Sequence, residues 1–177
     1  MRTFLALPVP ENVRAHLSVQ QFLLPLPNTV PPETFHITLS YLGEVPDGVL
    51  EGVHDRLLGL RSRAFDLHLH GLGHFGHARP HTVFACVMPS DPLSRLQAKV
   101  AVLARAAGAV IPAARYVPHV TLGRFRTPPL DDCMRIERSI AESGAFRTEP
   151  FAVREVILYQ SFPGPRYDAL ATYPLTP

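Results

Sequence analysis

The sequence has 177 residues, of which 46% are hydrophobic and 18% are charged. These proportions exclude an intrinsically disordered chain and are typical of one globular domain, or of two small lobes that share a core. The formal net charge of +2 suits a local site for an anionic ligand and argues against an extended basic surface for nucleic acid.

Targeting signals and disulfides are not expected. No apolar run approaches the ~20 residues of a membrane span, and the N-terminal apolar stretch meets Pro8 and Pro10 too early for a signal peptide. Cys86 and Cys133 lie far apart in no metal-binding spacing, so we expect reduced packing residues in a cytoplasmic protein. No extended interface pattern is visible, and a monomer is expected.

The first part of the chain predicts alternating strands and helices. Residues 2–9 are apolar and predict a strand, and apolar residues at helical spacing predict a helix over 11–25. A proline-rich connector leads to a strand at 35–42. A second helix is expected over 47–60, with Asp47 as its N-cap.

The middle of the chain predicts a hairpin, a helix and another strand. Residues 64–72 alternate polar and apolar side chains and predict one strand, which a glycine-rich turn connects to a strand at 82–88. A third helix is expected to begin at Asp91 and to end at Gly108. The next strand is expected at about 117–125.

The last part of the chain predicts a short amphipathic helix that Gly144 ends, followed by strands at 151–162 and 167–175. Helices mixed with hairpins indicate an α+β protein with largely antiparallel sheets. Because no linker divides the chain, residues 1–177 are expected to form a single bilobal domain. Its two halves have loosely corresponding strands that could face a shared cleft.

One short pattern occurs twice, as "HITL" at residues 36–39 and "HVTL" at residues 119–122. On a strand, residues two apart project to the same side, so His36 and Thr38 point together, as do His119 and Thr121. A single histidine on a strand usually has only a packing role. Its repetition with the same threonine favours a functional site.

The residue types in this pattern suit acid–base chemistry on a phosphate. Two imidazoles with ordinary pKa values of ~6.5 can divide the roles of general base and general acid near neutral pH. The threonine hydroxyls can bind phosphate oxygens or orient the rings. Arg124, five residues after His119, offers a cation for the same anion.

The doubled pattern resembles that of the two-histidine (2H) phosphoesterase superfamily. The segments "RTFLALPVPENVRAHL", "HITLSYLGEV", "VPHVTLGRFR" and "VILYQSFPGPRYDALATYPL" are similar, in this order, to its RNA 2′,3′-cyclic phosphodiesterase branch, earlier named 2′–5′ RNA ligase. Many members of that branch carry a tryptophan before the first motif. This chain has no tryptophan, so any role of that ring must be filled otherwise.

The resemblance implies two pseudo-symmetric lobes of antiparallel sheet, with helices outside, on either side of a central cleft. It implies hydrolysis of a 2′,3′-cyclic phosphate on an RNA end or a nucleotide to a 2′-phosphate, without metal or other cofactor, and possible 2′–5′ ligation. His36 and His119 are then the catalytic pair, while Thr38, Thr121 and Arg124 bind the substrate. Which histidine is the acid stays open, although analogy favours His119.

Two alternatives remain. The fold could serve a non-catalytic module that binds RNA ends or nucleotides. Five clustered histidines could instead form a zinc or nickel site, although no cysteine accompanies them and exposed hairpin residues are the simpler interpretation: His68, His70, His74, His77 and His81.

Three further side chains could border the cleft. Phe75 offers a face on which a nucleobase could stack, although an anchoring role in its loop is the simpler interpretation. Tyr159 and Ser161, in one of the last strands, could contact the cleft or could simply pack within the sheet.

Overall fold

The computed structural model describes residues 1–177 and contains a large sheet, a small sheet and four α-helices. The strands are β1 (Arg2–Pro8), β2 (His36–Glu44), β3 (Phe65–Leu67), β4 (Leu69–Phe75), β5 (Thr82–Val87), β6 (His119–Arg124), β7 (Phe151–Val153), β8 (Glu155–Phe162) and β9 (Arg166–Pro174). The helices are α1 (Glu11–Phe22), α2 (Asp47–Leu58), α3 (Asp91–Ala106), α4 (Leu130–Glu142) and the short 3₁₀ helix η1 (Pro32–Thr34).

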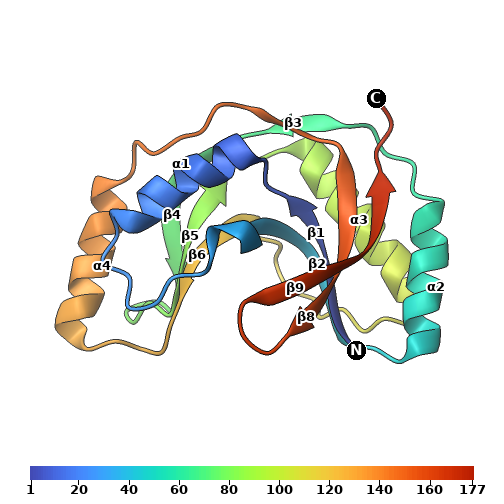
Figure 1. Cartoon of the computed structure of the whole chain (residues 1–177), viewed down its shortest axis with the longest axis horizontal. Helices are drawn as coiled ribbons and strands as arrows, with labels where there is room; N and C mark the ends of the chain where they lie inside the picture. Colours follow the sequence, from blue (N-terminus) through green and yellow to red (C-terminus); the bar gives the residue numbers. More distant parts are fainter.

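Seven strands form one antiparallel sheet in the order β4-β5-β6-β2-β1-β8-β9. Its two halves meet where β6 lies beside β2, through the pair of Ile37 and Val120. Figure 1 shows α1 and α4 beside β4, β5 and β6, and α2 and α3 beside the other half. The expected α+β fold with two antiparallel lobes is confirmed, and the two lobes share one continuous sheet.

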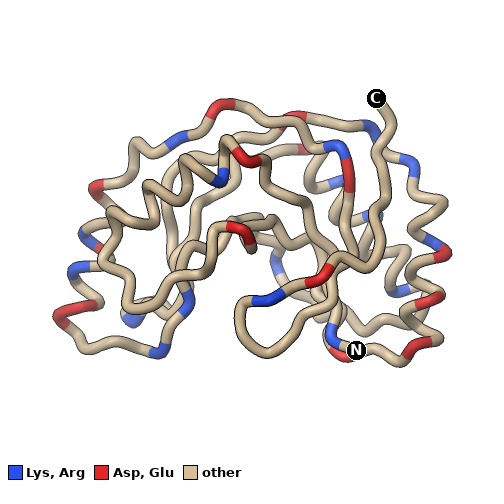
Figure 2. The backbone as a smooth tube through the Cα atoms, in the orientation of Figure 1, with Lys and Arg blue, Asp and Glu red and all other residues tan.

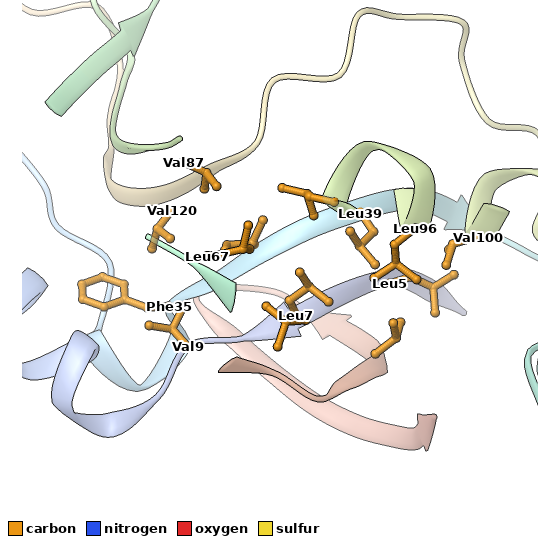
Figure 3. Close-up of a cluster of buried hydrophobic side chains, with 14 of the residues drawn as sticks. Leu5, Leu7, Val9, Phe35, Leu39, Leu67, Val87, Leu96, Val100 and Val120 are labelled. Atoms are coloured by element: carbon orange, nitrogen blue, oxygen red, sulfur yellow. The ribbon is translucent and has the colours of Figure 1, made fainter. Parts of the chain in front are cut away.

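Alternation along β1 and β2 gives this sheet two different faces. Leu5, Leu7, Ile37 and Leu39 are almost completely buried on one face, where Leu96 of α3 packs in the same core cluster (Figure 3). Burying each such side chain stabilises the fold by about 1.5–3 kcal/mol. His36 and Thr38 alternate with Ile37 and Leu39 along β2 and therefore project from the opposite face.

The small sheet was not predicted. Residues 64–72 and 151–162 were each expected to form one strand, but β3 pairs with β7 in a separate two-stranded sheet. The chain passes to the large sheet at His68 and at Arg154. Leu67 is 2% exposed and Leu69 is 0% exposed, so the alternation continues through the break and cannot reveal the change of sheet.

Several helix ends follow the expected signals, but α1 ends at Phe22 and α2 at Leu58, before the expected residues 25 and 60, and Asp47 is not an N-cap. Pro46 is the N-cap of α2, and Asp47 is the first helical residue, where its charge still favours the helix dipole. In α3 the hydroxyl of Ser90 accepts the Leu93 N–H at 3.3 Å. Gly108 follows the helix at φ 99°, a conformation that glycine adopts without strain. None of the helices is long and apolar enough to cross a bilayer.

Candidate active site

The two repeated strands lie side by side at the junction of the lobes. Ile37 pairs with Val120 in antiparallel register, and both side chains are fully buried. Continuing this register by one residue in each direction sets His36 opposite Thr121, and Thr38 opposite His119. The four side chains therefore share one face, in an arrangement with approximate twofold symmetry.

Each histidine is held by a backbone carbonyl two residues before it. Nδ1 of His36 lies 2.7 Å from the carbonyl oxygen of Thr34, and Nδ1 of His119 lies 2.7 Å from that of Val117. Because a carbonyl can only accept, Nδ1 carries the proton in both rings. Nε2 of each ring is therefore the atom that is free to exchange a proton.

Aromatic rings pack against each imidazole. Phe84 lies 4.9 Å from the His119 ring, centroid to centroid, and Phe75 meets it edge-on at 5.1 Å. His36 has equivalent neighbours in the other lobe. Phe4 lies 4.9 Å from its ring, and Tyr167 meets it edge-on at 5.3 Å.

These surroundings change the acidity of both rings. Burial lowers the pKa of His36 below its ordinary 6.5, the hydrogen bond to Thr34 partly opposes this, and the positive charges of His119 and Arg124 lower it further. Burial also lowers the pKa of His119, against the opposing hydrogen bond to Val117, and Arg124 adds to the lowering. Both imidazoles therefore favour the neutral form when the site holds no anion.

The histidines open into a cleft of about 330 Å³. All five residues predicted for the site line it, and no Asp or Glu is among its lining residues. The guanidinium groups of Arg2 and Arg124 both border this cleft, and neither forms a salt bridge. Two unneutralised cations in a concave site favour an anionic ligand.

Arg124 is positioned by the connector between α1 and η1. Its carbonyl accepts a hydrogen bond from the Asn28 side chain at 2.9 Å. The buried amide of Gln21 donates to the carbonyls of Val30 at 2.8 Å and Leu122 at 2.7 Å. Gly123 allows this close approach, because a Cβ there would lie 2.7 Å from the Asn28 carbonyl oxygen. The strand end that carries Arg124 is thus fixed by neighbouring backbone.

Sequence reasoning missed Arg2 and Tyr41, which also line the cleft. The Arg2 guanidinium lies 5.7 Å from the centre of the Tyr41 ring, within range of a cation–π contact. Tyr41 follows His36 at the spacing at which Arg124 follows His119, so aligning the two repeats could have identified it. Alternation in the first strand, which puts Arg2 and Phe4 on one face, could have identified Arg2.

The remaining histidines form no metal site. No group of three or more His, Cys, Asp or Glu side chains is placed to hold a metal ion. His54 of α2 shares a hydrogen bond of 2.9 Å with the hydroxyl of the buried Tyr173.

The three side chains considered for the rim of the cleft have different positions. Ser161 lines the cleft. Tyr159 is not among the lining residues and stacks on Phe4 at 5.2 Å. Phe75 packs on Phe84 at 4.5 Å and against His119, and it is not among the residues that line the cleft, so its ring supports the site from outside the cleft.

Comparison with known proteins agrees with this arrangement. The family model described as the 2′–5′ RNA ligase superfamily matches residues 9–161. A relative from Aeropyrum pernix, named RNA 2′,3′-cyclic phosphodiesterase, is 32% identical over 80% of this chain and 82% of its own length. A relative of the same name from Methanothermobacter thermautotrophicus is 31% identical over 91% of this chain and 90% of its own.

Solved structures share the fold over nearly the whole chain. A crystal structure from Thermus thermophilus has a TM-score of 0.77 and 26% identity, and the match covers 98% of this chain and 97% of that one. Escherichia coli LigT, solved in complex with 3′-AMP, has a TM-score of 0.78 at 23% identity, with 99% and 98% of the two chains covered. The lobes, the paired repeats and these matches lead to one conclusion: the chain belongs to the 2′–5′ RNA ligase superfamily.

Proposed function

We propose that this protein hydrolyses the 2′,3′-cyclic phosphate of an RNA end, or of a cyclic nucleotide, to a 2′-phosphate. Relatives at 31–32% identity carry the name RNA 2′,3′-cyclic phosphodiesterase. The observation that carries the proposal is the pair of imidazoles on adjacent strands, each with Nδ1 bound to a carbonyl and Nε2 left for the cleft.

The proton transfers suit two histidines in different states. A neutral His36 accepts a proton from water as the water oxygen attacks phosphorus. A protonated His119 donates a proton to O3′ as the bond between phosphorus and O3′ breaks. This assignment is supported by the charge of His119, which disfavours the protonated form of His36, whereas Arg124 disfavours the protonated form of both rings.

The remaining residues of the cleft suit the phosphate itself. The hydroxyls of Thr38 and Thr121 can donate hydrogen bonds to the non-bridging oxygens, whose charge increases in the transition state. The guanidinium groups of Arg2 and Arg124 can supply positive charge from the two lobes.

The proposal includes neither a metal ion nor any other cofactor. An imidazolium and two guanidinium groups can supply the charge stabilisation and positioning that phosphoryl chemistry requires. If the 5′-hydroxyl of a second RNA takes the place of water, the same groups join the two molecules through a 2′–5′ linkage. We therefore propose ligation as a secondary activity of the same site.

Hydrolysis of a 2′,3′-cyclic nucleotide with and without EDTA tests the function. We expect equal turnover in both conditions, with the 2′-phosphate as the product identified by ³¹P NMR. Loss of turnover in EDTA would contradict metal independence. Binding without turnover in either condition would indicate a non-catalytic module, and a 3′-phosphate product would contradict the proposed bond cleavage.

Replacing Arg124 with alanine is expected to lower kcat/KM for the cyclic nucleotide at least ~10-fold, because one fixed cation is lost from the phosphate site. Arg124→Lys should recover part of this loss, since it keeps the charge without the planar fork. Arg126→Ala is a matched control, because Arg126 is also exposed but does not line the cleft. Equal kinetics for Arg124→Ala and Arg126→Ala would remove Arg124 from the site.

A further inference from the structure

A second concave site lies on the side of the molecule away from the catalytic cleft. We name it the α3 groove; its volume is about 710 Å³, and it is lined by Arg61, Ser62, Arg63, Ala64, Phe65, Pro92, Arg95, Lys99 and Thr176. Helix α3 covers the core face of the sheet, where Gln97 donates to the carbonyl of Leu39 at 3.3 Å. The groove borders this helix, whereas His36 and Thr38 open from the opposite face of β2.

Four of the lining residues are cationic and exposed to solvent, namely Arg61, Arg63, Arg95 and Lys99. No Asp or Glu lines the groove, and neither of the two salt bridges in the structure involves these four side chains. Arg61 and Arg63 lie on the connector after α2, and Arg95 and Lys99 lie on α3. Figure 2 shows basic positions on both of these segments. Like charges that line one groove repel one another, and a bound anion would relieve this repulsion.

The backbone wall of the α3 groove is fixed by its own hydrogen bonds. The Lys99 ammonium donates to the carbonyl of Arg61. The Ser62 carbonyl accepts from both the backbone N–H of Thr176, at 2.9 Å, and its hydroxyl, at 3.1 Å. Ala64 N–H in turn donates to the Thr176 carbonyl at 2.7 Å. Arg61 and Arg63 therefore extend from a backbone that is already ordered, so no backbone entropy is lost there when they bind a ligand.

We propose that the α3 groove is a second phosphate-binding site, which takes a ligand that carries several phosphate groups. Guanidinium forks match phosphate oxygens in pairs, and three of the four cations are arginines. The volume lies within the range of roughly 300–1,000 Å³ typical of small-molecule sites. This is more room than one phosphate needs, and it suits the polyphosphate of a nucleotide or consecutive phosphates of an RNA backbone.

An NMR titration of the full chain with tripolyphosphate tests this site directly. We expect saturable shifts of the backbone amides of Ser62, Ala64 and Phe65. In the double variant Arg63→Gln/Arg95→Gln, binding measured at these amides should weaken at least tenfold. Shifts confined to the catalytic cleft, or an unchanged affinity in this variant, would overturn the proposal.

The matched control is the double variant Arg105→Gln/Arg138→Gln, which removes two charges from exposed helix positions outside the groove. It should bind tripolyphosphate at the α3 groove as the parent does. If tripolyphosphate binding is weakened equally in both double variants, only net charge matters, and the proposal of a site in the α3 groove is wrong. Turnover of a 2′,3′-cyclic nucleotide should stay unchanged in Arg63→Gln/Arg95→Gln, so this result is separate from the proposed catalytic function.

Two further titrations identify the source of the phosphates. One uses a nucleoside triphosphate, and the other uses a single-stranded RNA of about 20 nucleotides that ends in a 3′-hydroxyl. Shifts of the groove amides with the triphosphate alone would indicate a small nucleotide. Shifts with the RNA, weakened in Arg63→Gln/Arg95→Gln, would indicate backbone phosphates. If neither molecule shifts these amides, the proposal of a polyphosphorylated ligand is wrong.

Discussion

Replacing either His36 or His119 with alanine is expected to lower kcat for a 2′,3′-cyclic nucleotide at least ~10²-fold, because each change removes one proton transfer from the proposed step. Steady-state kinetics at saturating substrate, with the 2′-phosphate measured as product, give this value. If either variant turns over at the parent rate, its histidine is not the proposed acid or base.

The fold should survive both substitutions. Each ring makes one hydrogen bond to a backbone carbonyl, and the other ring nitrogen is left for the cleft. Losing one such hydrogen bond costs about 1 kcal/mol of unfolding free energy. Matching circular dichroism spectra and a melting temperature within a few degrees of the parent would separate lost chemistry from lost structure.

Two further variants make the result specific. His68→Ala removes an imidazole that neither lines the cleft nor forms a side-chain hydrogen bond, and it should keep the parent kcat. In the double variant of His36 and His119, the loss should be smaller than the product of the two single losses, because the two rings act in one concerted step. A fully multiplicative loss would indicate that the two histidines act independently.

The side chains of the site were predictable because strand alternation is local. Two-residue spacing set each histidine beside its threonine and opposite the buried Ile37 or Val120. The meeting of β2 and β6 was not predictable in this way. Their antiparallel register is set by pairing between distant segments, which no local pattern encodes, and only the repetition of the motif suggested it.

The aromatic surroundings of the histidines show the same limit. Phe4 reaches His36 from β1, and Tyr167 reaches it from β9, more than 120 residues further along the chain. Phe84 reaches His119 because β5 pairs with β6, where Phe84 is the partner of Thr121. These rings read as ordinary apolar strand residues in the sequence. Their effect on the imidazoles follows from the strand order alone.

The difference between the two lobes is explained only when the sequence and the structure are considered together. At the fifth position after the histidine, one repeat has Arg124 and the other has Tyr41. In the structure the missing cation is replaced by Arg2, which comes from β1 and lies over the Tyr41 ring. Both lobes therefore present a guanidinium to the cleft, one from the motif strand itself and one from its neighbour.

The pH dependence of kcat/KM is expected to have its maximum below pH 6.5. The proposed step needs one neutral and one protonated imidazole, and kcat/KM reports the ionisation of the free enzyme. Burial lowers the pKa of both rings below 6.5. The form with one protonated and one neutral imidazole is therefore most abundant below pH 6.5. Above it kcat/KM should fall about tenfold per pH unit, because the protonated acid disappears.

Substrate binding should move the maximum of kcat to a higher pH than that of kcat/KM, because the phosphate anion stabilises the protonated ring of His119. Replacing Phe75, which packs against His119, tests whether burial of the ring causes the low pH of the maximum. In Phe75→Ala the His119 ring is more hydrated, so its pKa should rise and the maximum of kcat/KM should move to higher pH. Phe22→Ala removes a phenylalanine that is 87% exposed on α1 and should leave the profile in place. A maximum of kcat/KM at or above pH 7 in the parent, or equal profiles for parent and Phe75→Ala, would show that burial of the imidazoles does not control the reaction.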